Sequence, residues 1–316
     1  MLLVSGGTGF IGRSVLRRLT EFGYPIRTLL RPSSRSPDLP HGVAVDVTLA
    51  ALSDRRGVRA SLIGVDTVVH LADTESYRRT SRRIAADVEG TRTIAEACVE
   101  AGVSRLIYIS QLGADRASAY PAMRAKAIAE DHIRKSGVPY TIFRSAVVFG
   151  RDDNFSTSLA MLLAASPLFF PIPGDGSVLL QPLWVEDLAT CLTWALDDPS
   201  TIGEVYEIGG PEFLTLRQLL QIIMQAASCP RILLSFRPPY LRAAAWLLER
   251  TFPRLPVSPH WMDYLAVNRT TDLNTLPTVF SLQPSRMEDN LTYLQEKNWG
   301  WELLARQFSR ANEADL

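Results

Sequence analysis

The chain has 316 residues with 33 basic and 33 acidic side chains, so its formal net charge is zero. This balance lacks the basic excess that drives nucleic-acid binding, and we expect no nucleic-acid partner. Apolar residues make up 47% and charged residues 21%, which is ordinary for a globular protein and excludes general disorder. A chain of this length can bury a full core without disulfide or metal support.

Three cysteines stand far apart, and the four histidines form no ligand-spaced cluster with them. The odd cysteine count favours a reducing compartment over a disulfide framework, and we expect no metal site. The first residues lack the pattern of a secretory signal. The longest apolar stretch, 159–172, is interrupted by prolines and too short for a spanning helix. We therefore expect a cytoplasmic protein.

Short apolar runs alternate with segments of helical periodicity in the first half of the chain. The runs predict strands at 2–5, 26–30, 43–47, 67–71, 106–110 and 140–144. Several are apolar at successive positions, as in parallel strands covered on both faces. Helices are expected between them, one ending at Gly23, one over 81–101 and one over 122–136. This alternation predicts an α/β fold with a doubly wound parallel sheet.

The pattern changes after Gly150, where proline-rich and aromatic segments surround single helices such as 216–225. We therefore divide the chain into a strand–helix half at 1–150 and a smaller, irregular C-terminal lobe at 151–316 that faces the substrate or a partner. A return of some strands of this lobe to the main sheet is left open.

A glycine-rich motif, Gly6-Gly7-Thr8-Gly9-Phe10-Ile11-Gly12, follows the first predicted strand and opens the first helix. Gly6 permits a tight turn, Gly9 lets the backbone approach a pyrophosphate, and Gly12 lets helix and strand pack closely. The phosphates would lie at the positive end of the helix dipole. The motif stands in the context that a dinucleotide site requires. It predicts cofactor contacts from Gly6, Thr8, Gly9, Phe10, Ile11 and Gly12.

The residues after the second predicted strand bear on which dinucleotide binds. An NAD-selective site carries an acidic residue about 20 residues beyond the glycines. This chain instead has Arg31, followed by Ser33 and Arg35. A guanidinium and hydroxyl groups suit a ribose 2′-phosphate, although a solvated loop arginine is the alternative. We therefore favour NADP(H) over NAD(H).

Further cofactor contacts are expected at the ends of the third and fourth predicted strands. Asp46 and Val47 would end the third strand and cap the adenine. Leu71 and Ala72 follow the fourth strand, at the edge where ligands cross such sheets. His70 has apolar neighbours, so we expect a packed core histidine rather than a catalyst.

These motifs resemble the short-chain dehydrogenase/reductase superfamily, in its extended and atypical branch. In the family's order stand the glycine motif and the segments 66–72, 90–91, 140–145, 182–189 and 206–211. The chain looks most like the branch that contains the nucleotide-binding accessory subunit of respiratory complex I and related NAD(P)-binding proteins. The resemblance implies that 1–150 is an NAD(P)-binding Rossmann domain. It also implies that Ser145 and Val148 lie beside the nicotinamide carboxamide.

The same resemblance implies a catalytic tyrosine four residues before a lysine. In such enzymes the tyrosine transfers the proton, the lysine binds the nicotinamide ribose, and a serine or threonine orients the carbonyl. Lys126 stands in the expected helix, but Ala122 occupies the position of the tyrosine. Tyr120, just before Pro121 at the expected helix start, is the remaining candidate. Ser110 stands one or two residues before the usual hydroxyl position. The catalytic half of the motif is therefore degraded.

Residues 231–254 form an arginine-rich segment, with five arginines against the single Glu249. Alanine, leucine and Trp246 dominate its second half. Such a segment can lie on a membrane surface or dock on a partner protein. We expect it instead to pack as a core helix of the small lobe.

Three functions are compatible with these residues. The first is an NADPH-dependent oxidoreductase acting on a small organic substrate, with Lys126 and Tyr120 at its centre. The second is a non-catalytic NADPH-binding structural or assembly factor of a larger respiratory or membrane-associated complex, stabilised by its cofactor. The arginine-rich segment would then contact the complex or a membrane surface, at the membrane periphery. The third is a nucleotide-sugar epimerase, against which the alanine at 122 counts first.

Overall fold

A seven-stranded parallel sheet forms the centre of the protein. The computed structural model describes residues 1–33, 39–71, 81–252 and 254–308. Its sheet has the order β11-β6-β5-β4-β1-β2-β3, with every neighbouring pair parallel. The strands are β1 (Leu2–Ser5), β2 (Ile26–Leu30), β3 (Asp46–Leu49), β4 (Thr67–His70), β5 (Arg105–Gln111), β6 (Tyr140–Ser145) and β11 (Val205–Ile208). The order reverses between β1 and β4, which is where doubly wound sheets bind ligands.

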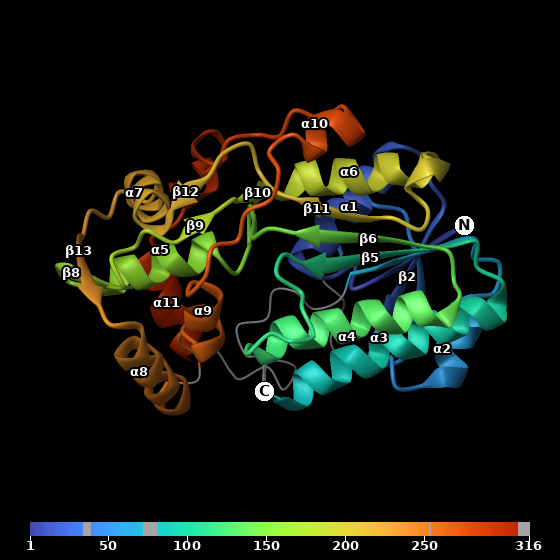
Figure 1. Cartoon of the computed structure of the whole chain (residues 1–316), viewed down its shortest axis with the longest axis horizontal. Coiled ribbons are helices and arrows are strands. Elements are labelled where there is room, and N and C mark those ends of the chain that lie inside the picture. Colours follow the sequence, from blue (N-terminus) through green and yellow to red (C-terminus); the bar gives the residue numbers. More distant parts are fainter. Residues whose placement is uncertain (34–38, 72–80, 253, 309–316) are drawn as a thin grey trace.

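Helices cover both faces of this sheet, so the molecule has a three-layer core (Figure 1). One face carries α1 (Phe10–Glu21), α6 (Val185–Asp197) and α10 (Thr275–Phe280). The other carries α2 (Arg55–Ser61), α3 (Ser81–Ala101) and α4 (Pro121–Ser136). The strands β5 and β6 point their carboxyl ends toward the second lobe, which places the ligand-binding edge between the two parts (Figure 1).

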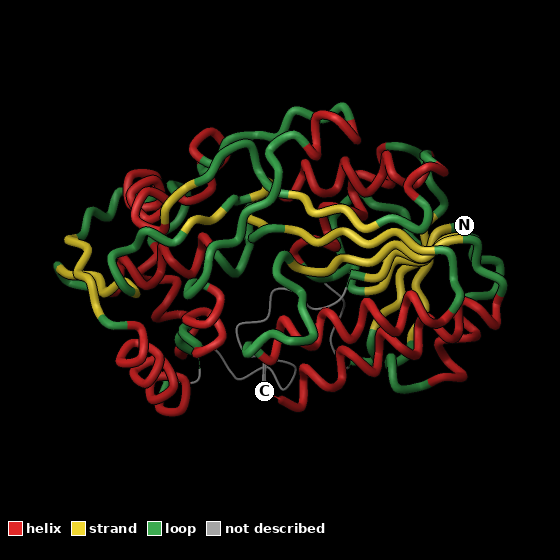
Figure 2. Tube along the Cα trace, viewed as in Figure 1, coloured by secondary structure: helices red, strands yellow, loops and turns green. Residues whose placement is uncertain are grey.

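The second lobe is built from helices and two-stranded ribbons (Figure 2). Its helices are α5 (Ser156–Ala165), α7 (Leu216–Ala226), α8 (Pro238–Thr251), α9 (Pro259–Tyr264) and α11 (Trp299–Phe308). Its strand pairs are β7 (Val148–Phe149) with β10 (Leu183–Trp184), β8 (Phe169–Pro173) with β13 (Ile232–Phe236), and β9 (Leu179–Leu180) with β12 (Leu214–Thr215). Three 3₁₀ turns complete the described elements: Pro199–Thr201, Glu288–Asn290 and Thr292–Leu294.

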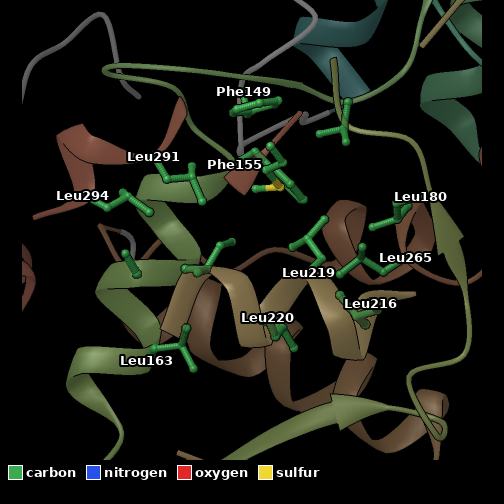
Figure 3. Close-up of a cluster of buried hydrophobic side chains, with 14 of the residues drawn as sticks. Phe149, Phe155, Leu163, Leu180, Leu216, Leu219, Leu220, Leu265, Leu291 and Leu294 are labelled. Carbon is green, nitrogen blue, oxygen red and sulfur yellow. The ribbon is translucent and has the colours of Figure 1, made fainter. Parts of the chain in front are cut away.

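The second lobe has its own apolar core, in which α5 and α7 face each other (Figure 3). Leu163 from α5 and Leu216, Leu219 and Leu220 from α7 are all buried there. The sequence starts α7 at a defined point, because Thr215 and Gln218 form a reciprocal capping box. The cap fixes the helix start, and burial of the leucine face supplies most of its stability.

Most predicted elements of the first half are confirmed, with one displaced strand. β1, β2 and α3 have the predicted bounds, whereas β3 spans Asp46–Leu49 instead of 43–47. Val43 and Val45 pack against the core around α1, but they lie outside any strand. Their apolar side chains therefore gave the signal that was interpreted as a strand. The edge strand itself is largely exposed, so its side chains carry little of the signal that marks a buried strand.

The expectation of a core helix in the arginine-rich segment is wrong. α8 forms there, but Ala245 is its only buried residue. Tyr240, Trp246 and Leu247 are 67%, 55% and 54% exposed. The helix lies at the far end of the second lobe, beside the β8–β13 ribbon (Figure 1). None of the helices in the described ranges is both long and apolar enough to cross a membrane.

Candidate functional site

The glycine motif forms a tight loop between β1 and α1, and two of its glycines are sterically required. Gly6 has a φ of 81°, and a Cβ there would lie 2.5 Å from the carbonyl oxygen of Leu71. A Cβ on Gly12 would lie 2.1 Å from the carbonyl oxygen of Gly6. A side chain at either position would therefore displace the backbone of the loop. Phe10 and Ile11 are buried, so only their backbone can face a ligand.

The start of α1 is open to an anionic ligand. Gly9 is the N-cap, is exposed, and provides no side-chain cap. A Cβ at Gly9 would approach only the carbonyl oxygen of Gly6, at 3.3 Å, so a ligand can come close to this backbone. The first N–H groups of the helix are then free of intrahelical partners and carry the positive end of its dipole. This cradle fits the pyrophosphate of a dinucleotide.

A basic side chain that the motif reasoning missed lies beside this loop. Arg13 follows the last glycine of the motif, and its guanidinium donates a hydrogen bond to the carbonyl oxygen of Thr8 at 2.9 Å. It also lies 3.8 Å from Asp152 of the second lobe. The guanidinium therefore adds positive charge next to the helix start. An arginine directly after a glycine motif was the available signal.

The carboxyl ends of β2 and β4 place several predicted residues along the same edge. Arg31 and Ser33 follow β2 and are exposed. Leu71 follows β4 and donates its backbone N–H to the carbonyl oxygen of Ser5 at 3.1 Å. The carbonyl oxygen of Leu71 lies against Gly6 of the glycine loop. Arg35 and Ala72 lie outside the described residues. The choice between the two dinucleotides therefore stays a prediction from Arg31 and Ser33.

The strand position predicted for Asp46 and Val47 is wrong. In the sheet register Asp46 pairs with Arg27 and Val47 with Thr28, so both stand at the amino end of β3 rather than at its carboxyl end. The strand reaches the ligand-binding edge three residues later, at Leu49, which pairs with Leu30. An adenine contact from the Asp46 carboxylate is therefore not placed at this edge, and Ala50 follows the strand there.

His70 is a core histidine, as its apolar neighbours predicted. It is 2% exposed, its Nδ1 lies 2.5 Å from the Ser5 hydroxyl, and its Nε2 lies 3.1 Å from the Thr91 hydroxyl. Burial, together with the positive charge of Lys126, lowers the pKa of His70 to about 3. The ring therefore stays neutral near pH 7 and links the ends of β1 and β4 to α3.

Lys126 lies in α4 and is buried against β5 and α3. Its side chain is over the ring of Tyr108, with Nζ 5.5 Å from the ring centroid. Asp87 and Tyr108 line the same small cavity as Lys126. Asp87 comes from α3. Ala122, one turn before the lysine, is buried and has no group that can transfer a proton.

Two tyrosines stand near the place of the missing one. Tyr120 is the N-cap of α4, as Pro121 predicted, and is half-buried against the core of the second lobe. Tyr264, from α9, is buried, and burial raises its pKa to about 12. The guanidinium of Arg269 lies 4.4 Å from the Tyr264 ring centroid and donates to the carbonyl oxygen of Leu112 at 2.8 Å. Sequence reasoning missed Tyr264 and Arg269, because nothing in the chain order brings α9 next to β5.

Ser110 is not positioned to orient a substrate. Its hydroxyl donates to Glu130 at 2.6 Å, inside a buried cluster. Glu130 is fully buried and also receives bonds from Arg134 and Arg144, at 2.9 and 2.8 Å. The cluster ties α4 to β5 and β6. Arg144 therefore has a structural role in this cluster.

A pocket follows the carboxyl ends of β5 and β6. Gln111 lines it from β5, and Ser145 and Val148 line it from β6 and β7. The second lobe contributes Asn154, Phe155 and Trp261. Two predicted nicotinamide contacts, Ser145 and Val148, thus meet Gln111 in one pocket. The described residues contain no group of three or more His, Cys, Asp and Glu placed to hold a metal ion.

Comparisons with known proteins agree with this geometry. A family model described as NAD(P)H-binding matches residues 6–161. The mitochondrial NADH dehydrogenase [ubiquinone] 1 alpha subcomplex subunit 9 of Arabidopsis thaliana is 30% identical over 229 residues, which cover 70% of this chain and 56% of the relative. The chain thus spans little more than half the length of that relative.

Two further proteins match nearly the whole chain. The (4-alkanoyl-5-oxo-2,5-dihydrofuran-3-yl)methyl phosphate reductase of Streptomyces griseus is 29% identical over 294 residues, 90% of this chain and 94% of the relative. The structure of an NADPH-dependent quinone oxidoreductase from Escherichia coli, complexed with NADPH, superposes with a TM-score of 0.73 at 20% identity and covers 93% of this chain and 99% of that one. At that identity the likeness concerns the fold.

Proposed function

Because the chain belongs to the NAD(P)-binding Rossmann proteins of the atypical short-chain dehydrogenase/reductase branch, we propose that it is an NADPH-dependent reductase of a carbonyl compound. The observation that carries the proposal is that two features lie along the same carboxyl edge of the sheet. The open start of α1 lies at one end of this edge, and the pocket of Gln111, Ser145 and Val148 follows the strands at the other.

The chain's own residues divide the binding of the cofactor among them. The N–H groups at the start of α1, with Arg13 beside them, hold the pyrophosphate. Arg31 and Ser33 bind the 2′-phosphate, since a guanidinium donates paired hydrogen bonds to phosphate oxygens. Lys126 holds the nicotinamide ribose from α4. When bound, NADPH supplies a hydride to the substrate.

The proton comes from Tyr120 in this proposal. Its place at the N-cap of α4 puts it at the end of the helix that carries Lys126, and it is half-buried rather than sealed in the core. Gln111 takes the place of the superfamily's serine and orients the carbonyl with its amide. The relatives named as reductases support reduction as the reaction class.

Cofactor binding and turnover test the proposal separately. We expect NADPH to raise the melting temperature, since a ligand at 100 times its dissociation constant adds about 2.7 kcal/mol to stability. NADH should raise it less, because it has no 2′-phosphate for Arg31 to bind. With NADPH and a panel of ketones and aldehydes, absorbance at the nicotinamide band should fall. Tyr120→Phe should slow this turnover by roughly 10²- to 10⁴-fold without changing the NADPH-induced shift. An unchanged rate in Tyr120→Phe would remove the tyrosine from the mechanism.

A second candidate function is favoured by a specific surface. α8 and the β13 strand before it expose Tyr240, Trp246, Leu247 and Phe236 next to the arginines of 231–254. Surfaces of this composition usually contact a partner. A non-catalytic NADPH-binding factor, docked through this surface on a larger assembly, would resemble the relatives named as NADH dehydrogenase subunits.

The two candidates give different results with the purified protein. Stabilisation by NADPH without turnover of any carbonyl supports the non-catalytic factor. Substitution of Trp246 and Leu247 by serine should then abolish its recovery with the assembly and leave NADPH binding intact. Sedimentation with anionic phospholipid vesicles would show a membrane as the docking surface instead. The epimerase reading has the least support, because Ala122 removes the tyrosine on which that chemistry depends.

A further inference from the structure

A second cavity lies in the second lobe. Its lining is largely apolar, as is usual for ligand pockets. α5, β8, α7 and α9 form its walls, with side chains that include Leu162, Phe170, Leu216, Leu220 and Leu265. Several of these belong to the apolar cluster of Figure 3. Among the described lining residues, the polar side-chain groups are those of Asn154 and Ser158 and the indole N–H of Trp261.

This cavity adjoins the pocket at the ends of β5 and β6. Asn154, Phe155 and Trp261 line both. The segment from Asn154 to Ser158 therefore passes from the pocket beside Gln111 and Ser145 into the apolar cavity. A single ligand can place a polar end in the first space and an apolar end in the second.

The Ser158 hydroxyl does not make the cavity a site for water. It is buried, at 2% exposure, and has no hydrogen-bond partner among the described residues. Its neighbours on α5 are satisfied, since Ser156 donates to Asp153 at 2.7 Å and the Thr157 N–H to the same side chain at 2.9 Å. An isolated water would be held poorly here, because a buried water needs two to four polar partners.

We propose that this cavity binds the aliphatic tail of the substrate, so that the protein acts on carbonyl compounds with a long apolar chain. The assignment rests on the proposed reductase function for the carbonyl end. The carbonyl lies beside Gln111 and Ser145, and the chain runs past Phe155 and Trp261 to Ser158 and the leucines of α7. Transfer of each methylene of the tail from water into such an apolar lining is favourable.

A series of 2-alkanones from four to twelve carbons tests the proposal. Binding to the protein loaded with NADP⁺, which prevents turnover, is followed by the tryptophan fluorescence to which Trp261 contributes. We expect the dissociation constant to fall about fourfold per added methylene until the cavity is filled. Equal affinity at all lengths overturns the proposal.

Two substitutions at Ser158 separate filling of the cavity from loss of its hydroxyl. Ser158→Ala should keep the chain-length dependence and at least the wild-type melting temperature, because the hydroxyl it removes has no partner. Ser158→Leu should flatten the dependence beyond six to eight carbons, since its side chain occupies the space of the tail. Leu162→Trp should do the same, and Leu304→Trp, on the exposed face of α11, serves as its matched control. A dependence that survives both fillings overturns the proposal.

The series also distinguishes this inference from the proposed function. If long ketones bind in proportion to chain length but no carbonyl is reduced with NADPH, the tail site stands and the reductase assignment fails. If short carbonyls are reduced and chain length has no effect on binding, the reductase assignment stands and the tail site fails. Retained stabilisation by NADPH shows that each variant is folded.

Discussion

Charge at a single position accounts for the expected cofactor preference. Arg31 follows β2 at the ligand-binding edge, where an NAD-selective chain has an acidic residue. The preference is electrostatic, because a guanidinium attracts the 2′-phosphate and a carboxylate would repel it. Its neighbour Ser33 can add a hydrogen bond but no charge.

Reversal of this charge should reverse the preference. Arg31→Asp is expected to weaken NADPH binding by at least tenfold, since a hydrogen bond to a charged group contributes about 1.5–3 kcal/mol. NADH binding should stay the same or improve, as measured by isothermal titration. Arg56→Asp, on the exposed start of α2, changes the net charge equally and should leave both affinities unchanged. An unaltered NADPH preference in Arg31→Asp would exclude this arginine from selectivity.

The buried His70 couples the stability of the fold to pH. Its pKa is about 3 in the folded protein, below the ordinary value of 6.5, because burial disfavours the charged ring. Between these values the unfolded chain binds a proton that the folded protein does not. The contribution of neutral His70 is therefore complete above about pH 6.5 and is lost as the pH falls toward 3.

Replacement of His70 by glutamine should remove this dependence. Between pH 7.5 and 5.5 the wild-type free energy of unfolding should fall by about 1.4 kcal/mol more than that of His70→Gln. Urea denaturation at the two pH values measures the difference. His41→Gln is the matched control, because this ring is exposed to solvent in the folded protein. Equal pH dependence in wild type and His70→Gln would mean that His70 is not the titrating group.

At the scale of elements, α7 and α8 show how similar sequence patterns meet different fates. Both helices carry leucines at helical spacing. α7 buries Leu219 and Leu220 against α5, whereas α8 exposes Trp246 and Leu247 to solvent. Periodicity identifies the apolar face of a helix. It does not say whether another element of the same chain covers that face.

Exposure of α8 predicts that its apolar residues contribute little to stability. The double substitution of Trp246 and Leu247 by serine should change the free energy of unfolding by no more than about 0.5 kcal/mol per site. Leu219→Ser in α7 should cost at least 2–5 kcal/mol, the usual range for a buried leucine cut to a small residue. Urea denaturation compares them. A large loss of stability in the α8 variant would restore the core-helix interpretation.

At the scale of the whole molecule, the nucleotide-binding half needs residues from beyond Gly150. β11 pairs with β6 at the edge of the sheet, and α6 packs on α1. Leu188, Leu192 and Ile208 from these elements share one apolar cluster with Val4 and Phe143. The sheet and its covering layer are therefore completed only after the chain has begun the second lobe.

This arrangement predicts that the first 150 residues do not fold alone. A chain cut after Gly150 would expose the apolar face under α6 and the unpaired edge of β6, which favours aggregation. We expect it to lack a cooperative thermal transition by circular dichroism and to gain no stability from NADPH. The complete chain should show both. A cooperative, NADPH-dependent transition in the shortened chain would establish 1–150 as an independent domain.

The sequence predicted local features well where the signal is contained in neighbouring residues. Gly6 and Gly12 follow a strand and open a helix, and their steric need is visible in the loop. Lys126 falls on α4 and Tyr120 at its N-cap, as expected. Asp46 was predicted at the wrong end of β3, because the side chains of this edge strand are largely exposed and show no pattern of burial. Tyr264, Arg269 and Trp261 were missed, because only packing brings α9 to β5.

The sequence by itself therefore determined the parallel sheet, the glycine loop and the class of cofactor, since these depend on hydrophobic periodicity and backbone sterics between residues close in the chain. Tertiary structure alone decided which apolar faces are covered, so α7 became core and α8 surface. It also decided that Gln111, Ser145 and Trp261 share a pocket and that an apolar cavity continues from it. The physical reason is that burial depends on contacts between segments distant in sequence, and local periodicity carries no record of the partner.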